Sequence, residues 1–163
     1  PDAAVLTDII VGFPGETEAQ FMDSYRLLDE LRLDVAHIAQ YSVRPGTVAA
    51  RTMNDDVPPE EKQRRWQLLE DRQTEIQAEK NSALLGRTVE VLAEERAKNG
   101  RWRGRTPQNK LVFFEGKGDW LGRETRVTLD WTGPFTLIGH AHADGAGPAA
   151  GPGPATSGIR VPG

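Results

Sequence analysis

Residues 5–17 read VLTDIIVGFPGET, a short apolar run that ends in a turn rich in glycine and proline. Only Thr7 and Asp8 interrupt the run, which is typical of a strand in a parallel sheet that is buried on both faces. Thr17 then opens a helix, because Gln20 three residues later completes a capping-box pattern. The stretch therefore predicts a strand followed directly by a helix.

The following residues extend this pattern to a second strand. Apolar side chains recur at helical spacing on one stripe, at Phe21, Tyr25, Leu28 and Leu31. Residues 35–41 (VAHIAQY) predict a strand, and Arg44-Pro45-Gly46 closes it. A strand, a helix and a strand within about 40 residues form a βαβ unit, which belongs to an α/β fold.

Residues 58–85 predict one long helix after a loop at 47–57. Two prolines suit its first turn, and Gly86 suits its end. One face carries Trp66, Leu69, Gln73, Ile76 and Leu84. Because the helix is long and mostly polar, we expect a strut between two domains rather than a core element.

From Arg87 onward the apolar pattern repeats every second residue. The expected strands are 88–92, 101–105, 110–114, 124–131 and 135–140. Five short strands in about 55 residues indicate a small closed β-barrel of the OB-like kind. Residues 143–163 are of low complexity in alanine, glycine and proline, and we expect them to be disordered.

Charge divides the chain at about the same point. Residues 1–85 carry nine basic and sixteen acidic side chains, a net charge of −7. Residues 86–142 carry ten basic and seven acidic side chains, a net charge of +3. We therefore expect a domain boundary near residue 86, with the basic half facing a polyanionic partner.

The chain has no cysteine, so it cannot itself hold a disulfide, a thiolate zinc site or a cysteine-bound iron–sulfur cluster. His140 and His142 have no acidic cluster near them in sequence, and we expect exposed histidines and no metal site. No segment suits a membrane helix or a secretion signal. Because the chain starts at Pro1 with what reads as a buried strand, we expect a piece of a longer protein.

The segment from Arg96 to Lys110 is the strongest candidate for a binding surface, with six basic residues and no acidic one. Three arginines alternate within it, at Arg101, Arg103 and Arg105. Alternate side chains of a strand share one face and stand about 7 Å apart, close to the spacing of phosphates along a single nucleic-acid strand. Asn109 adds hydrogen-bonding capacity, and Trp102 is expected in the core. The alternative is a solvated basic hairpin.

Three positions in the first half suit ligand contact. The turn at Gly12 follows a parallel strand, at the face where α/β barrels bind ligands, although local features favour a turn that merely links strand to helix. Asp8 lies in an apolar strand, so its carboxylate is either capped by neighbours or faces a polar ligand. Arg44 suits a carboxylate or phosphate, or is a surface arginine held by the following proline.

Together these segments resemble the MiaB-type tRNA methylthiotransferases. The resemblance is carried, in order, by residues 7–17 (TDIIVGFPGET), 41–49 (YSVRPGTVA), 57–60 (VPPE), 104–106 (GRT) and 109–114 (NKLVFF). It covers residues 1 to about 141. Val43 departs from the pattern, because the family usually has proline there, and the loop around Arg44 is expected to be less rigid.

The resemblance implies four parts in this chain. Residues 1–57 would be a partial α/β barrel, the end of a TIM-like radical S-adenosylmethionine barrel, and residues 58–85 a connecting helix. Residues 86–142 would be an all-β OB-like TRAM barrel, followed by the tail at 143–163.

The resemblance also implies an enzyme of the cytoplasm that adds a 2-methylthio group to isopentenyladenosine next to the anticodon of tRNA. Its cofactors would be S-adenosylmethionine and two 4Fe–4S clusters, whose cysteine ligands this chain lacks, so the fragment alone would be inactive and would hold no catalytic residue. Asp8, Ile10 and Gly12 would lie along the S-adenosylmethionine site and Arg44 near the substrate pocket. The TRAM barrel would bind the anticodon arm through Arg101, Arg103, Arg105, Asn109 and Lys110.

Two other functions remain open from the sequence. A sister family methylthiolates an aspartate of a ribosomal protein and shares the same two folds, but its TRAM barrel meets protein rather than RNA. The arginine row favours RNA. The second alternative is a non-catalytic RNA-binding fragment, which an upstream, in-frame C-x-x-x-C-x-x-C motif would argue against.

Overall fold

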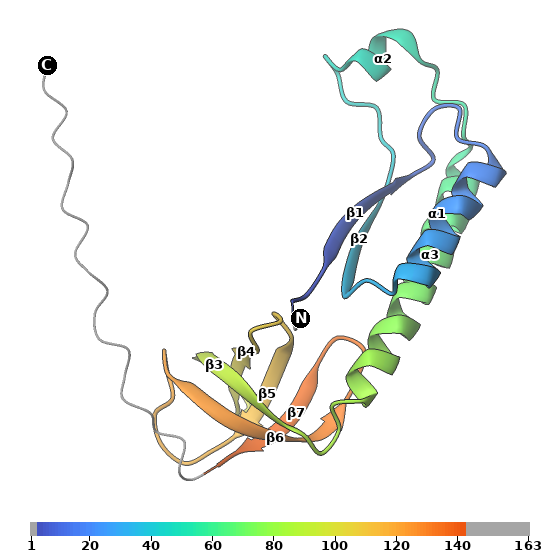
Figure 1. Cartoon of the computed structure of the whole chain (residues 1–163). Helices are drawn as coiled ribbons and strands as arrows, with labels where there is room; N and C mark the ends of the chain where they lie inside the picture. Colours follow the sequence, from blue (N-terminus) through green and yellow to red (C-terminus); the bar gives the residue numbers. More distant parts are fainter. Residues whose placement is uncertain (1–2, 143–163) are drawn as a thin grey trace, which may run out of the picture.

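The computed structural model describes residues 3–142, which form an α/β unit and a β-barrel joined by one long helix (Figure 1). The α/β unit contains β1 (Leu6–Val11), α1 (Glu18–Leu31), β2 (Val35–Gln40), α2 (Val48–Thr52) and α3 (Pro59–Ser82). The barrel contains β3 (Thr88–Arg96), β4 (Trp102–Arg105), β5 (Leu111–Glu115), β6 (Glu124–Thr132) and β7 (Leu137–Ala141). The tail predicted at 143–163 lies outside the described residues.

The βαβ unit is confirmed. β1 and β2 pair in parallel, from Leu6 opposite Val35 to Val11 opposite Gln40. Thr17 caps α1 and forms both hydrogen bonds of the capping box with Gln20. Local hydrogen bonding therefore starts this helix where the sequence predicts.

Only one face of the two-stranded sheet is covered, so the expected burial of both faces is wrong for the described residues. Figure 1 shows α1 and α3 on the same side of β1 and β2. On the opposite face Leu6 is 47% exposed and Ile10 is 57% exposed. A strand that is apolar on both faces needs a second covering layer, and the described residues supply just one.

Helix α3 belongs to the core of the α/β unit, which corrects the expectation of a simple strut. Leu69 and Ile76 are fully buried and pack in one cluster with Val11, Phe21, Leu28 and Ala36. The Trp66 indole N–H donates to the carbonyl of Ile38 at 3.0 Å, which fixes the helix across β2. The apolar positions at three- and four-residue spacing thus outweigh the polar composition of the rest of the helix.

Two smaller expectations also change. The loop expected at 47–57 contains α2, because the Thr47 side chain accepts a hydrogen bond from the Ala50 N–H and caps a short helix. Leu31, expected on the buried stripe of α1, is 53% exposed in the last position of that helix.

The closed five-stranded barrel is confirmed, with strand order β3-β4-β5-β7-β6. β5 and β7 pair in parallel, and the other pairs are antiparallel. The core residues are Val91, Ala93, Trp102, Val112, Phe114, Trp120, Val127, Leu129 and Leu137. Gly104 and Gly139 lie against the backbone carbonyls of Leu92 and Thr128, where a Cβ would collide, so the barrel can close tightly at these strands.

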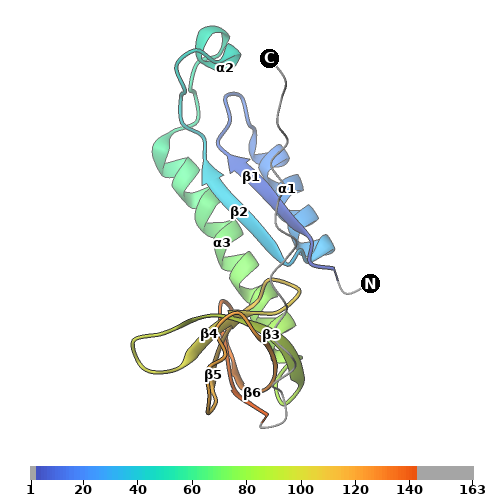
Figure 2. The ribbon, with the colours of Figure 1, turned by 90° about the vertical axis from the view of Figure 1, so that its left-hand side faces the viewer.

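The last turn of α3 attaches the barrel, which lies at the end of the helix opposite α2 (Figure 2). Asn81 is buried, and its amide donates to the carbonyls of Gly133 at 2.8 Å and Pro134 at 3.0 Å. Its side-chain oxygen accepts a 2.7 Å hydrogen bond from Lys110 Nζ. One asparagine therefore contacts two separate loops of the barrel and fixes the orientation of the barrel on the helix.

Candidate nucleic-acid interface

The three alternating arginines lie on the outer face of the barrel, as their spacing predicts. Arg103 and Arg105 are half-buried residues of β4, and Arg101 lies just before the strand. Trp102 and Gly104 between them are buried, which confirms the inward position of the indole. Strand pleating therefore presents the guanidinium groups on one side.

Each arginine of this row is already paired with a glutamate from a neighbouring strand. The pairs are Arg101–Glu115 at 3.1 Å, Arg103–Glu95 at 2.6 Å and Arg105–Glu94 at 3.6 Å. The hydrogen bond from Arg103 to Glu95 raises the pKa of this guanidinium above its ordinary value. The row carries little net charge, so each contact with a phosphate would exchange one anion for another.

Asn109 and Lys110 lie beyond the row and have structural partners. Asn109 adopts the left-handed backbone conformation, with φ of 62°, and its side-chain oxygen accepts a 3.1 Å hydrogen bond from Arg105. Lys110 reaches Asn81 on α3, and burial lowers the pKa of its ammonium group although Asp34 opposes this shift. The structure therefore brings Asn109 next to the arginines and directs Lys110 to the junction with the helix.

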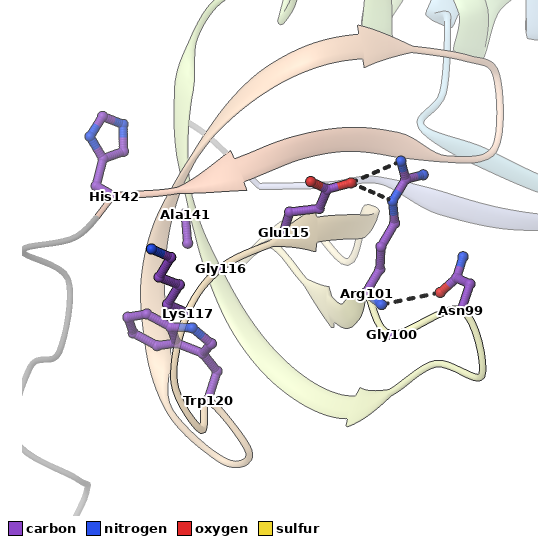
Figure 3. A pocket seen from close by; sticks show the side chains of 9 residues that line it. All are labelled: Asn99, Gly100, Arg101, Glu115, Gly116, Lys117, Trp120, Ala141 and His142. Atoms are coloured by element: carbon purple, nitrogen blue, oxygen red, sulfur yellow. Dashed lines mark hydrogen bonds and ion pairs between the residues drawn. The ribbon is translucent and has the colours of Figure 1, made fainter.

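A second surface of the barrel was not anticipated from the sequence. A groove of about 1090 Å³ lies between the β3–β4 turn and the β5–β6 loop (Figure 3). Its lining residues are Asn99, Gly100, Arg101, Glu115, Gly116, Lys117, Trp120, Ala141 and His142. The lysine and tryptophan within a glycine-rich loop were the available sequence signal, but spacing alone does not show that this loop meets the β3–β4 turn.

At the carboxyl ends of β1 and β2 the structure brings together two of the predicted ligand-binding residues. Ile10 and Arg44 both line a cavity of about 290 Å³, together with Phe13 and Tyr41. Asp8 does not line this cavity. Its carboxylate is exposed on the open face of the sheet and has no hydrogen bond within residues 3–142. Neighbouring groups in that range therefore do not cap it, and because it is exposed it needs no ligand to offset the cost of burial.

Gly12 is buried beside charged side chains of α3 that the sequence analysis missed. Its N–H donates to Glu16 at 2.6 Å, and Glu16 in turn pairs with the buried Arg65 at 2.7 Å. A Cβ at Gly12 would collide with the Lys62 side chain. Burial lowers the pKa of Arg65, but the hydrogen bonds that it donates to Glu16 and Glu61 raise it on balance. Gly12 therefore supports the turn, and its N–H is already used.

Lys62 and Arg65 could have been recognised by their helical spacing with Leu69, since three- and four-residue steps place all of them on the buried face. Lys62 pairs with Asp55 at 2.5 Å and donates to the carbonyl of Tyr41 at 3.3 Å. These contacts fix the loop that carries Arg44 to the helix.

The two histidines have separate partners. His140 pairs with Asp130 at 2.8 Å, and His142 forms a 2.7 Å hydrogen bond with Thr128. Residues 3–142 contain no cluster of three or more potential metal ligands. Among the helices of that same range, none has the length and apolar character needed to cross a membrane.

The closed barrel with a basic outer strand belongs to a recognised class: residues 83–141 match the TRAM domain. Most of the chain is also similar to named relatives. It is 51% identical over 142 residues to the tRNA-2-methylthio-N(6)-dimethylallyladenosine synthase of Roseiflexus sp. strain RS-1, covering 85% of this chain and 30% of the relative. It is 53% identical over 137 residues to the synthase of the same name from Dehalococcoides mccartyi strain 195, covering 84% of this chain and 32% of the relative.

A more distant relative agrees. The synthase of the same name from Thermotoga petrophila is 43% identical over 130 residues, which cover 80% of this chain and 29% of the relative. The chain thus spans about a third of the length of these proteins and matches their C-terminal part. This confirms the resemblance that the motifs indicate: the chain corresponds to the C-terminal part of the MiaB-type tRNA methylthiotransferases.

Proposed function

We propose that this chain is the C-terminal part of an enzyme that methylthiolates tRNA, and that its TRAM barrel binds the anticodon arm. The observation that carries the proposal is the continuous similarity, which runs through the βαβ unit, the long helix and the barrel at 51% identity over 142 residues. A barrel shared by itself would indicate RNA binding alone. Similarity on both sides of the Asn81 junction supports the same two-part arrangement as in the relatives.

The α/β unit would be the end of a radical S-adenosylmethionine barrel. Its open sheet face, with Leu6 and Ile10 exposed, supports this assignment, because such a face suits packing against further strands and their side chains. Residues 1–57 would then belong to the catalytic barrel and residues 58–85 to the connection, although α3 also packs in the core.

The residues at the carboxyl ends of β1 and β2 fit one edge of an S-adenosylmethionine or substrate site. Ile10 and Phe13 offer apolar contact, and Arg44 offers a guanidinium group for an anionic group. S-adenosylmethionine supplies an adenosyl radical and a methyl group when bound. The 4Fe–4S clusters of the full-length enzyme need cysteines, which this chain does not contain. Asp8 and Gly12 have less support, since neither lines this cavity.

The salt dependence of RNA binding tests the proposal. We expect the chain to bind an anticodon stem-loop with an affinity that falls steeply with salt, because phosphate contacts release counterions. Weak binding that does not change with salt would contradict RNA recognition.

A second candidate function is favoured by one observation, the complete pairing of the arginine row with glutamates. A surface of matched charges suits a protein partner such as the ribosomal protein of the sister family. The names of the relatives favour tRNA. Binding of the ribosomal protein, with no binding of the stem-loop, would reverse this order.

A further inference from the structure

We infer that the groove between the β3–β4 turn (97–101) and the β5–β6 loop (116–123) binds one unstacked nucleotide of the RNA. The inference rests on the proposed function and names where the barrel contacts a base. The groove volume of about 1090 Å³ slightly exceeds the roughly 300–1,000 Å³ common for small-molecule sites. A nucleotide with its phosphate therefore has room in it.

Within the described residues, unpaired positive charge on the two segments that enclose the groove supports this position. Arg101, Arg103 and Arg105 are ion-paired, and Lys110 is directed to the α3 junction. Lys98 in the β3–β4 turn and Lys117 in the β5–β6 loop are exposed and form no ion pair within residues 3–142. These two lysines lie on the two segments that enclose the groove.

The acidic groups at the groove do not cancel this charge. Glu115 is neutralised by Arg101, as the dashed lines in Figure 3 show. Asp119 lies in the β5–β6 loop, where its carboxylate accepts a hydrogen bond from the Leu121 N–H. The segments around the groove thus keep a net positive charge for a phosphate.

The groove also offers hydrogen-bonding groups that suit a base. Figure 3 shows Trp120 and Lys117 on the side of the β5–β6 loop, and Asn99 and Arg101 on the side of the β3–β4 turn. Asn99 accepts a 3.2 Å hydrogen bond from the Arg101 N–H, which leaves its amide N–H groups for a ligand. Amide side chains read the edges of bases in single-stranded RNA.

Trp120 provides an independent indication of a ligand. The side chain is 5% exposed, and its indole N–H is buried without an acceptor in the described part of the chain. Buried donors without a partner are rare and unfavourable. Gly116 borders this nitrogen, and a Cβ there would lie 2.9 Å from it, so a side chain at this position would crowd the indole N–H at the edge of the groove. An oxygen of a bound nucleotide would satisfy the donor.

An experiment can separate contacts with a base in the RNA loop from contacts with phosphates anywhere on the RNA. We would measure binding of the full chain to a fluorescent anticodon stem-loop across a salt series, and to a duplex of the stem without its loop. The variants are Lys117→Ala, Asn99→Ala and Trp120→Phe. The last of these keeps an aromatic ring and removes the indole N–H. The matched control is Arg87→Ala, an exposed basic residue before β3, at the opposite end of that strand from the groove.

The expected result is specific for each variant. Loss of one hydrogen bond in Asn99→Ala or Trp120→Phe should weaken stem-loop binding about fivefold, with the same salt slope and no change for the duplex. Lys117→Ala should lower the salt slope by about 0.7 to 0.9. Arg87→Ala should leave stem-loop affinity and slope as in the unaltered chain.

Two results would overturn the inference in different ways. Unaltered stem-loop binding by the Lys117 and Asn99 variants, both at exposed positions that do not endanger folding, would exclude the groove and leave the proposed function intact. Absence of stem-loop binding by the unaltered chain would reject the proposed function itself. A thermal unfolding curve of Trp120→Phe separates loss of contact from loss of fold.

Discussion

The α/β unit and the barrel differ in whether the edges of their strands are paired. In the barrel every strand pairs on both sides, because the order β3-β4-β5-β7-β6 closes on itself. In the α/β unit β1 pairs only with β2, and the outer face of the pair is exposed within residues 3–142. These two neighbouring parts of one chain therefore differ in how many strand edges are paired, since closure satisfies backbone groups that an open sheet leaves unpaired.

The largest expected effect comes from separating the two parts. We expect residues 83–142 to fold by themselves with a cooperative thermal transition, because their core is closed. Residues 3–82 should show no cooperative transition, because their sheet has open edges and one bare face. Circular dichroism of both fragments during heating checks this. A barrel fragment without a transition, or a cooperative α/β fragment, would contradict this difference between the two parts.

A buried ion pair should give the next largest effect, and only in the α/β unit. Arg65→Ala removes the partner of Glu16 in a nearly inaccessible position, so we expect a loss of about 3 kcal/mol in the free energy of unfolding. Hydrogen exchange of α1 amides should accelerate while amides of the barrel strands keep their protection.

Arg64→Ala is the matched control for that variant. Its guanidinium is 44% exposed and pairs with Glu18 and Glu61. Exposed pairs contribute less than about 1 kcal/mol, so exchange in α1 should change little. Equal effects of both variants would show that the buried position of Arg65 does not matter.

The junction should give a smaller effect that concerns both parts. Asn81→Ala removes the hydrogen bonds to Gly133, Pro134 and Lys110, which leaves the half-buried Lys110 ammonium without that acceptor. We expect about 1–3 kcal/mol of destabilisation and separate unfolding of barrel and helix. Differential scanning calorimetry would then resolve two transitions. Ser82→Ala, at the next and exposed position, should leave the thermogram unchanged.

Acid should weaken the α/β unit by the smallest amount. Hydrogen bonding to Arg64, with a further bond to Arg65, lowers the pKa of Glu61 to about 2 from the ordinary value of 4.5. Because the pKa of Glu61 is lower in the folded state, this carboxylate stabilises the folded state at pH values above its unfolded pKa. The contribution is lost as the pH falls from about 4.5 through about 2. Glu61→Gln should flatten the pH dependence of unfolding in that window, as urea titrations at several pH values would show. An unchanged slope would contradict this role of Glu61.

The secondary structure followed from the sequence because its causes are local. The capping box at Thr17, the apolar spacing of α3 and the alternation in β4 each depend on residues a few positions apart. The expectation of a strut at 58–85 failed because helical composition does not reveal what packs against the buried face. The same limit applies to β1, whose apolar pattern predicts two covering layers where the described residues provide one.

The candidate site shows the same division. The row of arginines on one outer face of the barrel could be predicted from the sequence, because side-chain direction in a strand alternates. The three-dimensional fold was needed to show that Glu94, Glu95 and Glu115 neutralise this row. It was also needed to show that Lys110 reaches Asn81 and that Trp120 lies across a groove from the β3–β4 turn. These partners lie on other strands or 29 positions away along the chain, and the closure of the barrel brings them together.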